Sequence, residues 1–143
     1  MRLEPLCAFD LRYTQEFHLS RPYGNESGTG WGVGDGQVSG ERLTGTAQWS
    51  NQPDRRGDGA MLPNARGVVL TEDGAEVLFS LTGRTVFVDR LGEEVGRQLL
   101  LVLLESEDER YAWVNNTVCV GDGLVSAETL TLHLEVFECV GEV

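Results

Sequence analysis

Few side chains in this sequence could carry out chemistry. It contains only two histidines, His18 and His133, and all eleven basic residues are arginines. The absence of lysine excludes Schiff-base catalysis and the lysine of a phosphate-binding loop. No metal-spaced pair of histidines and no G-x-S-x-G elbow is present. We therefore expect no metal and no cofactor, and any reaction would have to use carboxylates, Arg, Asn and Tyr.

Asn64 and Arg66 form the first candidate pair. They stand two residues apart and share one face if residues 64–71 form a strand. If that face points inward, the amide and the forked guanidinium would anchor a carboxylate, enolate or carbonyl oxygen. If it points outward, Arg66 is a solvated charge.

Residues 111–121 form the second candidate, because their side chains alternate with the period of a strand. One face is small and aliphatic apart from Asn116. The other face carries Tyr111, Trp113, Asn115, Thr117 and Cys119. Such a mixed face suits a ligand pocket, but it also suits a core in which Asn115 satisfies the aromatic polar groups. We expect one long strand here.

His133 and Glu135 could form an acid–base pair within residues 129–139. This segment also alternates, with Leu130, Leu132, Leu134 and Val136 on the opposite face. An antiparallel strand with one face in water explains the pattern more simply.

The composition limits the class of protein. A chain of 143 residues predicts a single domain, 1–143, and eighteen glycines with frequent turn signals predict an all-β fold. A net charge of −12 argues against nucleic acid and against an anionic membrane surface as partners. Three cysteines without C-x-x-C spacing and an N-terminus without an apolar run lead us to expect a cytoplasmic protein.

Alternating or apolar segments predict the strands that would position these residues. They cover residues 6–13, 16–21, 64–71, 76–82, 84–89, 98–105, 111–121 and 129–139, and residues 91–97 read as a polar connection. The glycine-rich run 24–45 has no helix after it, so we reject a phosphate-binding loop. The polar loop 48–59 is long enough to be functional. We expect an antiparallel barrel of eight to ten strands.

Several short motifs in this order resemble the DUF3237 family, also called the UPF0311 proteins. They are Gly36-x-x-x-Gly40-x-x-Leu43-x-Gly45, Trp49-Ser50-Asn51-Gln52-Pro53, Arg56-Gly57-Asp58-Gly59, Leu62-Pro63-Asn64-Ala65-Arg66-Gly67, Asp73-Gly74-Ala75, Gly83-Arg84 and Tyr111-x-Trp113-Val114-Asn115. The resemblance implies a lipocalin-like (calycin-type) antiparallel β-barrel with a central cavity, and an unassigned function. Asn64 replaces an aspartate common at that place.

These observations define a predicted ligand site and two functional hypotheses. The predicted site consists of Trp49, Asn64, Arg66, Tyr111, Trp113, Asn115 and Thr117. The first hypothesis is a barrel that binds a small carbonyl or carboxylate compound, or acts on it as a cofactor-independent isomerase, cyclase or lyase. In its sharpest form, Arg66 and Asn115 point into one cavity and hold an oxygen, with Trp113 packed on the apolar part. The alternative is a structural or partner-binding barrel, and homo-oligomerisation is compatible with either.

Overall fold

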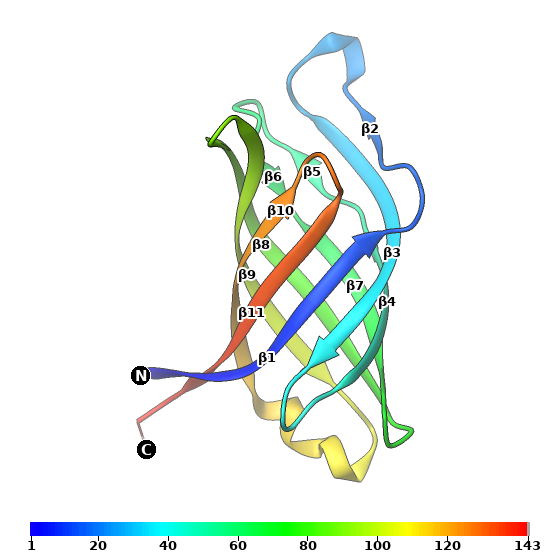
Figure 1. Cartoon of the computed structure of the whole chain (residues 1–143), viewed down its shortest axis with the longest axis vertical. Coiled ribbons are helices and arrows are strands. Elements are labelled where there is room, and N and C mark those ends of the chain that lie inside the picture. Colours follow the sequence, from blue (N-terminus) through cyan, green and yellow to red (C-terminus); the bar gives the residue numbers. More distant parts are fainter. Residues whose placement is uncertain (143) are drawn as a thin grey trace.

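The computed structural model describes residues 1–142, which form an antiparallel β-barrel with one end closed by a short helical segment (Figure 1). Eight strands build the wall: β1 (Arg2–Tyr13), β3 (Gly28–Ser39), β4 (Gly45–Asn51), β7 (Asn64–Thr71), β8 (Glu76–Arg90), β9 (Glu93–Glu105), β10 (Val118–Ser126) and β11 (Thr131–Val140). Three short strands lie at the other end: β2 (His18–Ser20), β5 (Asp54–Arg55) and β6 (Met61–Leu62). The 3₁₀ segments are η1 (Pro22–Gly24) and η2 (Glu109–Asn116).

The barrel closes because β1 pairs on both of its edges. Its partners are β11 and β3, and the circuit continues through β4, β7, β8, β9 and β10 back to β11. Every pairing is antiparallel. Closure leaves no long wall strand with a free edge. The expected all-β antiparallel barrel, with eight strands in its wall, is confirmed.

Alternation along the strands places one set of side chains in the core. Phe9, Val69, Val77, Val102 and Leu134 are fully buried on the inner face, and Phe9 packs edge-on against Phe79 at 5.2 Å between ring centroids. Together with their neighbours these residues fill the middle and the closed end of the barrel. The predicted faces are therefore correct for residues 7–13 and 131–136, with His133 and Glu135 exposed on the outside, whereas Leu6, predicted on the outer face, is buried next to Cys7.

The predicted strand 111–121 is wrong in its first half. Residues 109–116 form η2, and strand structure begins only at Val118. Asp108 caps η2, since its side chain accepts a hydrogen bond from the backbone N–H of Arg110. Tyr111 and Val114, three residues apart, are the two buried side chains of the segment. This is the spacing of a 3₁₀ turn, and it closes the barrel end near the two termini (Figure 1).

Two further strand boundaries differ from the prediction. Residues 76–90 form one strand, and Gly83, with a φ of 150°, lies inside it instead of separating two strands. The predicted polar connection 91–97 is reduced to a tight turn at Leu91 and Gly92, where both residues have positive φ. Within residues 1–142, no helix is both long enough and apolar enough to cross a membrane.

Candidate functional site

The candidate site is a cavity of about 170 Å³ inside the open end of the barrel. A narrower space of about 40 Å³ continues from it toward the core. The residues that line both spaces are Tyr13, Asn51, Pro63, Gln98, Val125 and Leu130. We call these two spaces together the mouth cavity. Its residues come from β1, β4, β8, β9 and β10 and from the loops next to them, and therefore from distant parts of the chain.

Tyr13 is the central polar residue of the mouth cavity. It continues the inward series of Phe9 and Leu11 on β1, and its ring lies edge-on to Trp49 at 4.7 Å and to Phe17 at 5.4 Å between centroids. Glycines on β3 make room for these rings: a Cβ at Gly32 would collide with the Tyr13 ring. The dense glycine run therefore has a packing role at the mouth.

The hydroxyl of Tyr13 is oriented by Asn51. Asn51 Nδ2 donates a hydrogen bond of 3.0 Å to the Tyr13 oxygen, and Asn51 Oδ1 accepts one of 3.0 Å from the backbone N–H of Asn64. Within residues 1–142 the Tyr13 hydroxyl donates its own proton to no protein group. Burial raises the pKa of Tyr13, and the hydrogen bond from Asn51 opposes this only in part. At neutral pH, Tyr13 is therefore a protonated donor whose hydrogen is available to a ligand.

Gln98 supplies a second unpartnered polar group. Its Nε2 donates a hydrogen bond of 2.8 Å to Thr85 Oγ1, whereas its Oε1 is buried without a partner in the part of the chain that the structure describes. Turning the amide over would exchange the two atoms and leave the other one without a partner. A buried polar atom without a hydrogen bond is destabilising by about 1–3 kcal/mol. Because this atom lies at the wall of a cavity, a molecule that enters the cavity can hydrogen-bond to it.

The rest of the mouth cavity is uncharged and mostly apolar; its other polar side chains, Thr85 and Ser126, already have hydrogen-bond partners. Its remaining lining includes Phe17, Pro53, Met61, Phe87, Leu100 and Leu132, and no lining residue carries a formal charge. Trp49 also contributes, although its indole N–H already donates to the carbonyl of Asp35 at 2.9 Å. A charged ligand would lose its hydration here without gaining an ion pair.

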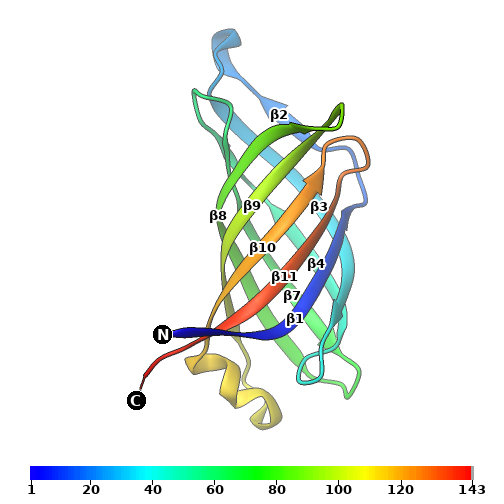
Figure 2. The same cartoon turned by 60° about the vertical axis from the view of Figure 1, so that its left-hand side comes forward.

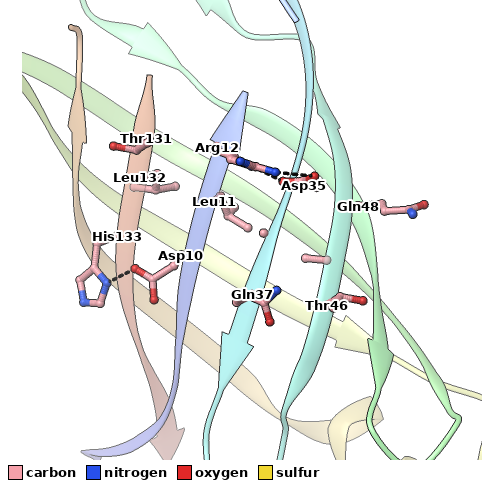
Figure 3. A pocket seen from close by; sticks show the side chains of 12 residues that line it. Asp10, Leu11, Arg12, Asp35, Gln37, Thr46, Gln48, Thr131, Leu132 and His133 are labelled. Atoms are coloured by element: carbon pink, nitrogen blue, oxygen red, sulfur yellow. Dashed lines mark hydrogen bonds and ion pairs between the residues drawn. The ribbon is translucent and has the colours of Figure 1, made fainter. Parts of the chain in front are cut away.

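A larger hollow of about 540 Å³ on the outside of the barrel is a weaker candidate (Figure 3). Its charged side chains already satisfy one another. Arg12 binds Asp35 at 2.7 Å, and His133 lies between Asp10 at 2.6 Å and Glu135 at 2.8 Å. These hydrogen bonds raise the pKa of His133. These groups are exposed to solvent and already paired with one another. None of them therefore needs a ligand as a hydrogen-bond or ion-pair partner.

Only one of the seven predicted site residues, Trp49, lines the mouth cavity. Asn64 and Arg66 are exposed on the outer face of β7, whose inner face carries Ala65 and Val69. Asn64 nevertheless serves the cavity through its backbone N–H, which fixes Asn51. The prediction that Arg66 points inward is wrong, because the alternation of the strand assigns odd positions to the core.

The other four predicted residues lie at the closed end of the barrel, in and beside η2. Asn115 accepts a hydrogen bond from the Ser106 N–H at 2.8 Å and donates one to the Ser106 carbonyl at 2.9 Å. Thr117 Oγ1 donates to the Trp113 carbonyl at 2.7 Å. The guanidinium of Arg42 lies 3.8 Å from the centre of the Trp113 ring.

Tyr111 is buried and donates to Asp73 Oδ1 at 2.9 Å, so its hydroxyl also has a structural partner. Asn115 and Arg66 therefore share no cavity, and the predicted oxygen site formed by the two is wrong. Among residues 1–142, no three His, Cys, Asp or Glu side chains converge in a way that could hold a metal ion.

Sequence reasoning missed Tyr13, Asn51, Thr85 and Gln98. One signal was available for Gln98, which interrupts the inward apolar series of β9 formed by Leu100, Val102 and Leu104. A lone amide at a core position predicts either a specific partner or a function. The other three residues could be connected to it only once the register of the barrel was known.

Solved structures of similar shape exist. A β-barrel-like protein from Acinetobacter baumannii has a TM-score of 0.84 at 16% identity, covering 96% of this chain and 94% of its own. A protein of unknown function from Clostridium acetobutylicum has a TM-score of 0.84 at 16% identity, covering 98% and 100%. An enzyme from Penicillium herquei has a TM-score of 0.64 at 17% identity, covering 95% and 98%. At these identities the likeness concerns the fold alone.

A family model, and no individual curated protein, identifies the family. None of the curated proteins compared with the sequence matches it. The family model described as "Protein of unknown function (DUF3237)" matches residues 1–139. Because the match spans nearly the whole sequence, the chain belongs to the DUF3237 family.

Proposed function

We propose that the mouth cavity binds a small uncharged organic molecule that carries a carbonyl or phenolic oxygen. The observation that carries the proposal is the pair of unpartnered polar groups, the Tyr13 hydroxyl proton and the buried Gln98 amide atom, in an uncharged and mostly apolar cavity. Tyr13 would donate to the ligand oxygen. The Gln98 amide would bind a second polar group, and the apolar side chains would cover the remainder.

The size of the cavity suggests the size of the ligand. An apolar cavity of about 150 Å³ holds one benzene molecule. The 170 Å³ of the main compartment therefore suits one substituted ring, with any further part of the ligand extending past Phe87 toward solvent. A carboxylate ligand fits less well, because no arginine lines the cavity.

Catalysis on such a ligand would be limited to what Tyr13 can supply. A protonated phenol donates to a carbonyl oxygen and polarises it, which favours an isomerisation or cyclisation that begins with attack on that carbonyl. The cavity lining contains no carboxylate and no imidazole to remove a proton from carbon. The geometry thus favours binding with carbonyl polarisation over lyase chemistry. The Penicillium herquei structure is that of an enzyme, so a barrel of this fold is compatible with activity.

The test is NMR titration of the protein with three single-ring compounds that differ in their polar groups. 4-Hydroxybenzaldehyde should bind, whereas toluene should bind at least about tenfold more weakly because it leaves Tyr13 and Gln98 unpartnered. Benzoate should not bind, since the carboxylate would be desolvated without a cation. Preferential binding of benzoate would overturn the proposal.

The matched variants are Tyr13→Phe and Tyr23→Phe, which remove the same hydroxyl from the cavity and from a fully exposed position. The first should weaken 4-hydroxybenzaldehyde binding by about tenfold, as expected for one lost hydrogen bond. The second should leave binding unchanged. Equal affinity of Tyr13→Phe and the unmodified protein would remove the assigned role of Tyr13.

A further inference from the structure

The outer face of β9 carries apolar side chains that nothing in the described chain covers. Leu99, Leu101 and Leu103 point outward with exposed fractions of 68%, 40% and 41%. Val118 on β10, which pairs with Leu103, is 47% exposed. In Figure 2, strands β8, β9 and β10 run side by side at the front of the barrel with no other element over them. We call Leu99, Leu101, Leu103 and Val118 the β9 face.

The sequence of β9 has the pattern of a strand buried on both sides. Residues Leu99 to Leu104 form an uninterrupted apolar run, whereas a strand with one wet face alternates. The barrel interior buries Leu100, Val102 and Leu104. The opposite side of the same run lacks a cover, and exposed apolar patches of this kind on soluble proteins are associated with interaction sites.

The ends of the β9 face carry opposite charges. The outward positions of β9 read Arg97, Leu99, Leu101, Leu103, Glu105. Arg97 and Glu105 are both exposed, and within residues 1–142 neither has an ion-pair partner. Each lies four residues from Leu101, or about 13 Å along an extended strand. The strand is therefore complementary in charge to a second copy of itself running the opposite way.

We propose that the β9 face is the interface of a homodimer in which the β9 strands of two copies lie antiparallel, face to face. A two-fold axis passing near Leu101 and perpendicular to the strand would place Leu101 on Leu101 of the second copy. The same operation would place Leu99 on the second copy's Leu103. Arg97 of each copy would then face Glu105 of the other.

The charges select this orientation over the alternative one. A two-fold axis parallel to β9 would place Arg97 on Arg97 and Glu105 on Glu105, so that like charges would face each other at both ends. With the perpendicular axis, the neighbouring charges meet no like charge: Arg84 of β8 faces Ser80 of the second copy, and Asp122 of β10 faces Val118. Both follow from the register of β8 and β10 with β9.

A second copy also fits the charge of the whole molecule. Each chain has a formal net charge of −12, so two copies repel each other. The repulsion at the contact is smallest where the surface is poor in acidic groups. The centre of the β9 face carries no charge. The closed circuit leaves no wall strand with a free edge along its whole length, which disfavours an edge-to-edge association.

The experiment is sedimentation equilibrium of the purified chain and of charge-reversal variants. The unmodified protein should sediment with twice its chain mass of 15.7 kDa at tens of micromolar. Arg97→Glu and Glu105→Arg should each raise the dimer dissociation constant at least about tenfold, because symmetry creates two like-charge pairs per dimer. The double variant R97E/E105R exchanges the charges and should restore the dimer.

Two controls keep the outcome interpretable. Arg90→Glu makes the same change of charge at an exposed position beyond the β9 face, near the turn at Leu91, and should leave the dimer intact. Leu101→Gln should dissociate the dimer without altering the circular dichroism spectrum of the barrel. A monomeric unmodified chain, a trimer, or a double variant that does not recover would each overturn the proposal. A single reversal no more disruptive than Arg90→Glu would overturn it as well.

Discussion

Replacing the hydrogen-bonded pair Gln98 and Thr85 in the mouth cavity should stabilise the protein. Gln98 Nε2 donates to Thr85 Oγ1 at 2.8 Å, while Gln98 Oε1 has no partner. Thr85 is only 2% exposed, so valine, which has the same shape, fits in its place. The relevant variants are Thr85→Val, Gln98→Leu and the double variant T85V/Q98L.

The expected changes follow from counting unpartnered groups. Thr85→Val leaves both ends of the buried amide without a partner and should lower the free energy of unfolding by about 1–3 kcal/mol. Gln98→Leu removes the unpartnered oxygen but leaves the Thr85 hydroxyl alone, so the two effects nearly cancel. The double variant removes every polar atom of the pair and should raise the free energy of unfolding by about 1–3 kcal/mol.

Urea unfolding monitored by circular dichroism measures these differences, with an unchanged m-value as the sign that the two-state comparison holds. A gain of 1 kcal/mol corresponds to a rise of about 4 °C in melting temperature for a chain of this size. The same double variant should lose binding of 4-hydroxybenzaldehyde. If instead it unfolds more easily than the unmodified protein by more than about 1 kcal/mol, the amide belongs to a structural network, and the reasoning that reserves it for a ligand fails.

Three further predictions concern groups outside the mouth cavity. Asn115→Ala removes both hydrogen bonds to the Ser106 backbone and should lower the free energy of unfolding by about 1–3 kcal/mol without affecting ligand binding. Arg66→Met, at an exposed position, should change the free energy of unfolding by less than about 0.5 kcal/mol. Thermal unfolding tests the stability of the two variants, and the NMR titration tests their ligand binding. Asp10 and Glu135 raise the pKa of His133 in the folded protein. The stabilisation from protonated His133 is therefore present in full below the pKa of histidine in the unfolded chain, about 6.5, and is lost as the pH rises through the higher pKa of the folded state. The stability difference between the unmodified protein and His133→Asn should therefore shrink as the pH rises above about 6.5, with His18→Asn as the control; a difference that grows with pH would contradict the assignment. Burial raises the pKa of Cys7 to about 12 and that of Cys119 to about 11. A thiol reagent at pH 8 should therefore modify the half-buried Cys139 first. Equal labelling of all three cysteines, measured by mass spectrometry, would be inconsistent with the buried positions of Cys7 and Cys119.

The barrel could be predicted from the sequence because alternation reports directly on which face of a strand is buried. Residues 7–13 and 131–136 follow the pattern, and the structure pairs these two segments with each other. The strand prediction failed for residues 109–116 because Tyr111 and Trp113, two residues apart, have the spacing of a strand over a short stretch. The contrary signals were a capping residue, Asp108, and two consecutive asparagines, which strands disfavour.

The site could not be predicted to the same extent, because it depends on register. Whether Arg66 or Ala65 points inward is a matter of one residue along β7, and a slip of one residue exchanges the faces. Tyr13, Asn51 and Gln98 lie on three different wall strands, β1, β4 and β9, and they meet only because the closed circuit of strand pairings brings them to one cavity. The apolar run in β9 was visible, but it predicts burial on both faces, and only the structure shows that the chain itself covers one of them.

The position of β1 between β3 and β11 has a consequence for folding during synthesis. One edge of β1 can pair as soon as β3 has left the ribosome, but the other edge has no partner until β11, the last strand of the barrel in chain order, is complete. Until then β1 presents an unpaired strand edge, which is a template for aggregation. Contacts between residues so far apart in sequence also make folding slow. A chain that ends before residue 131 should therefore leave two open edges, on β1 and β10, and accumulate as insoluble aggregate instead of a partly closed barrel.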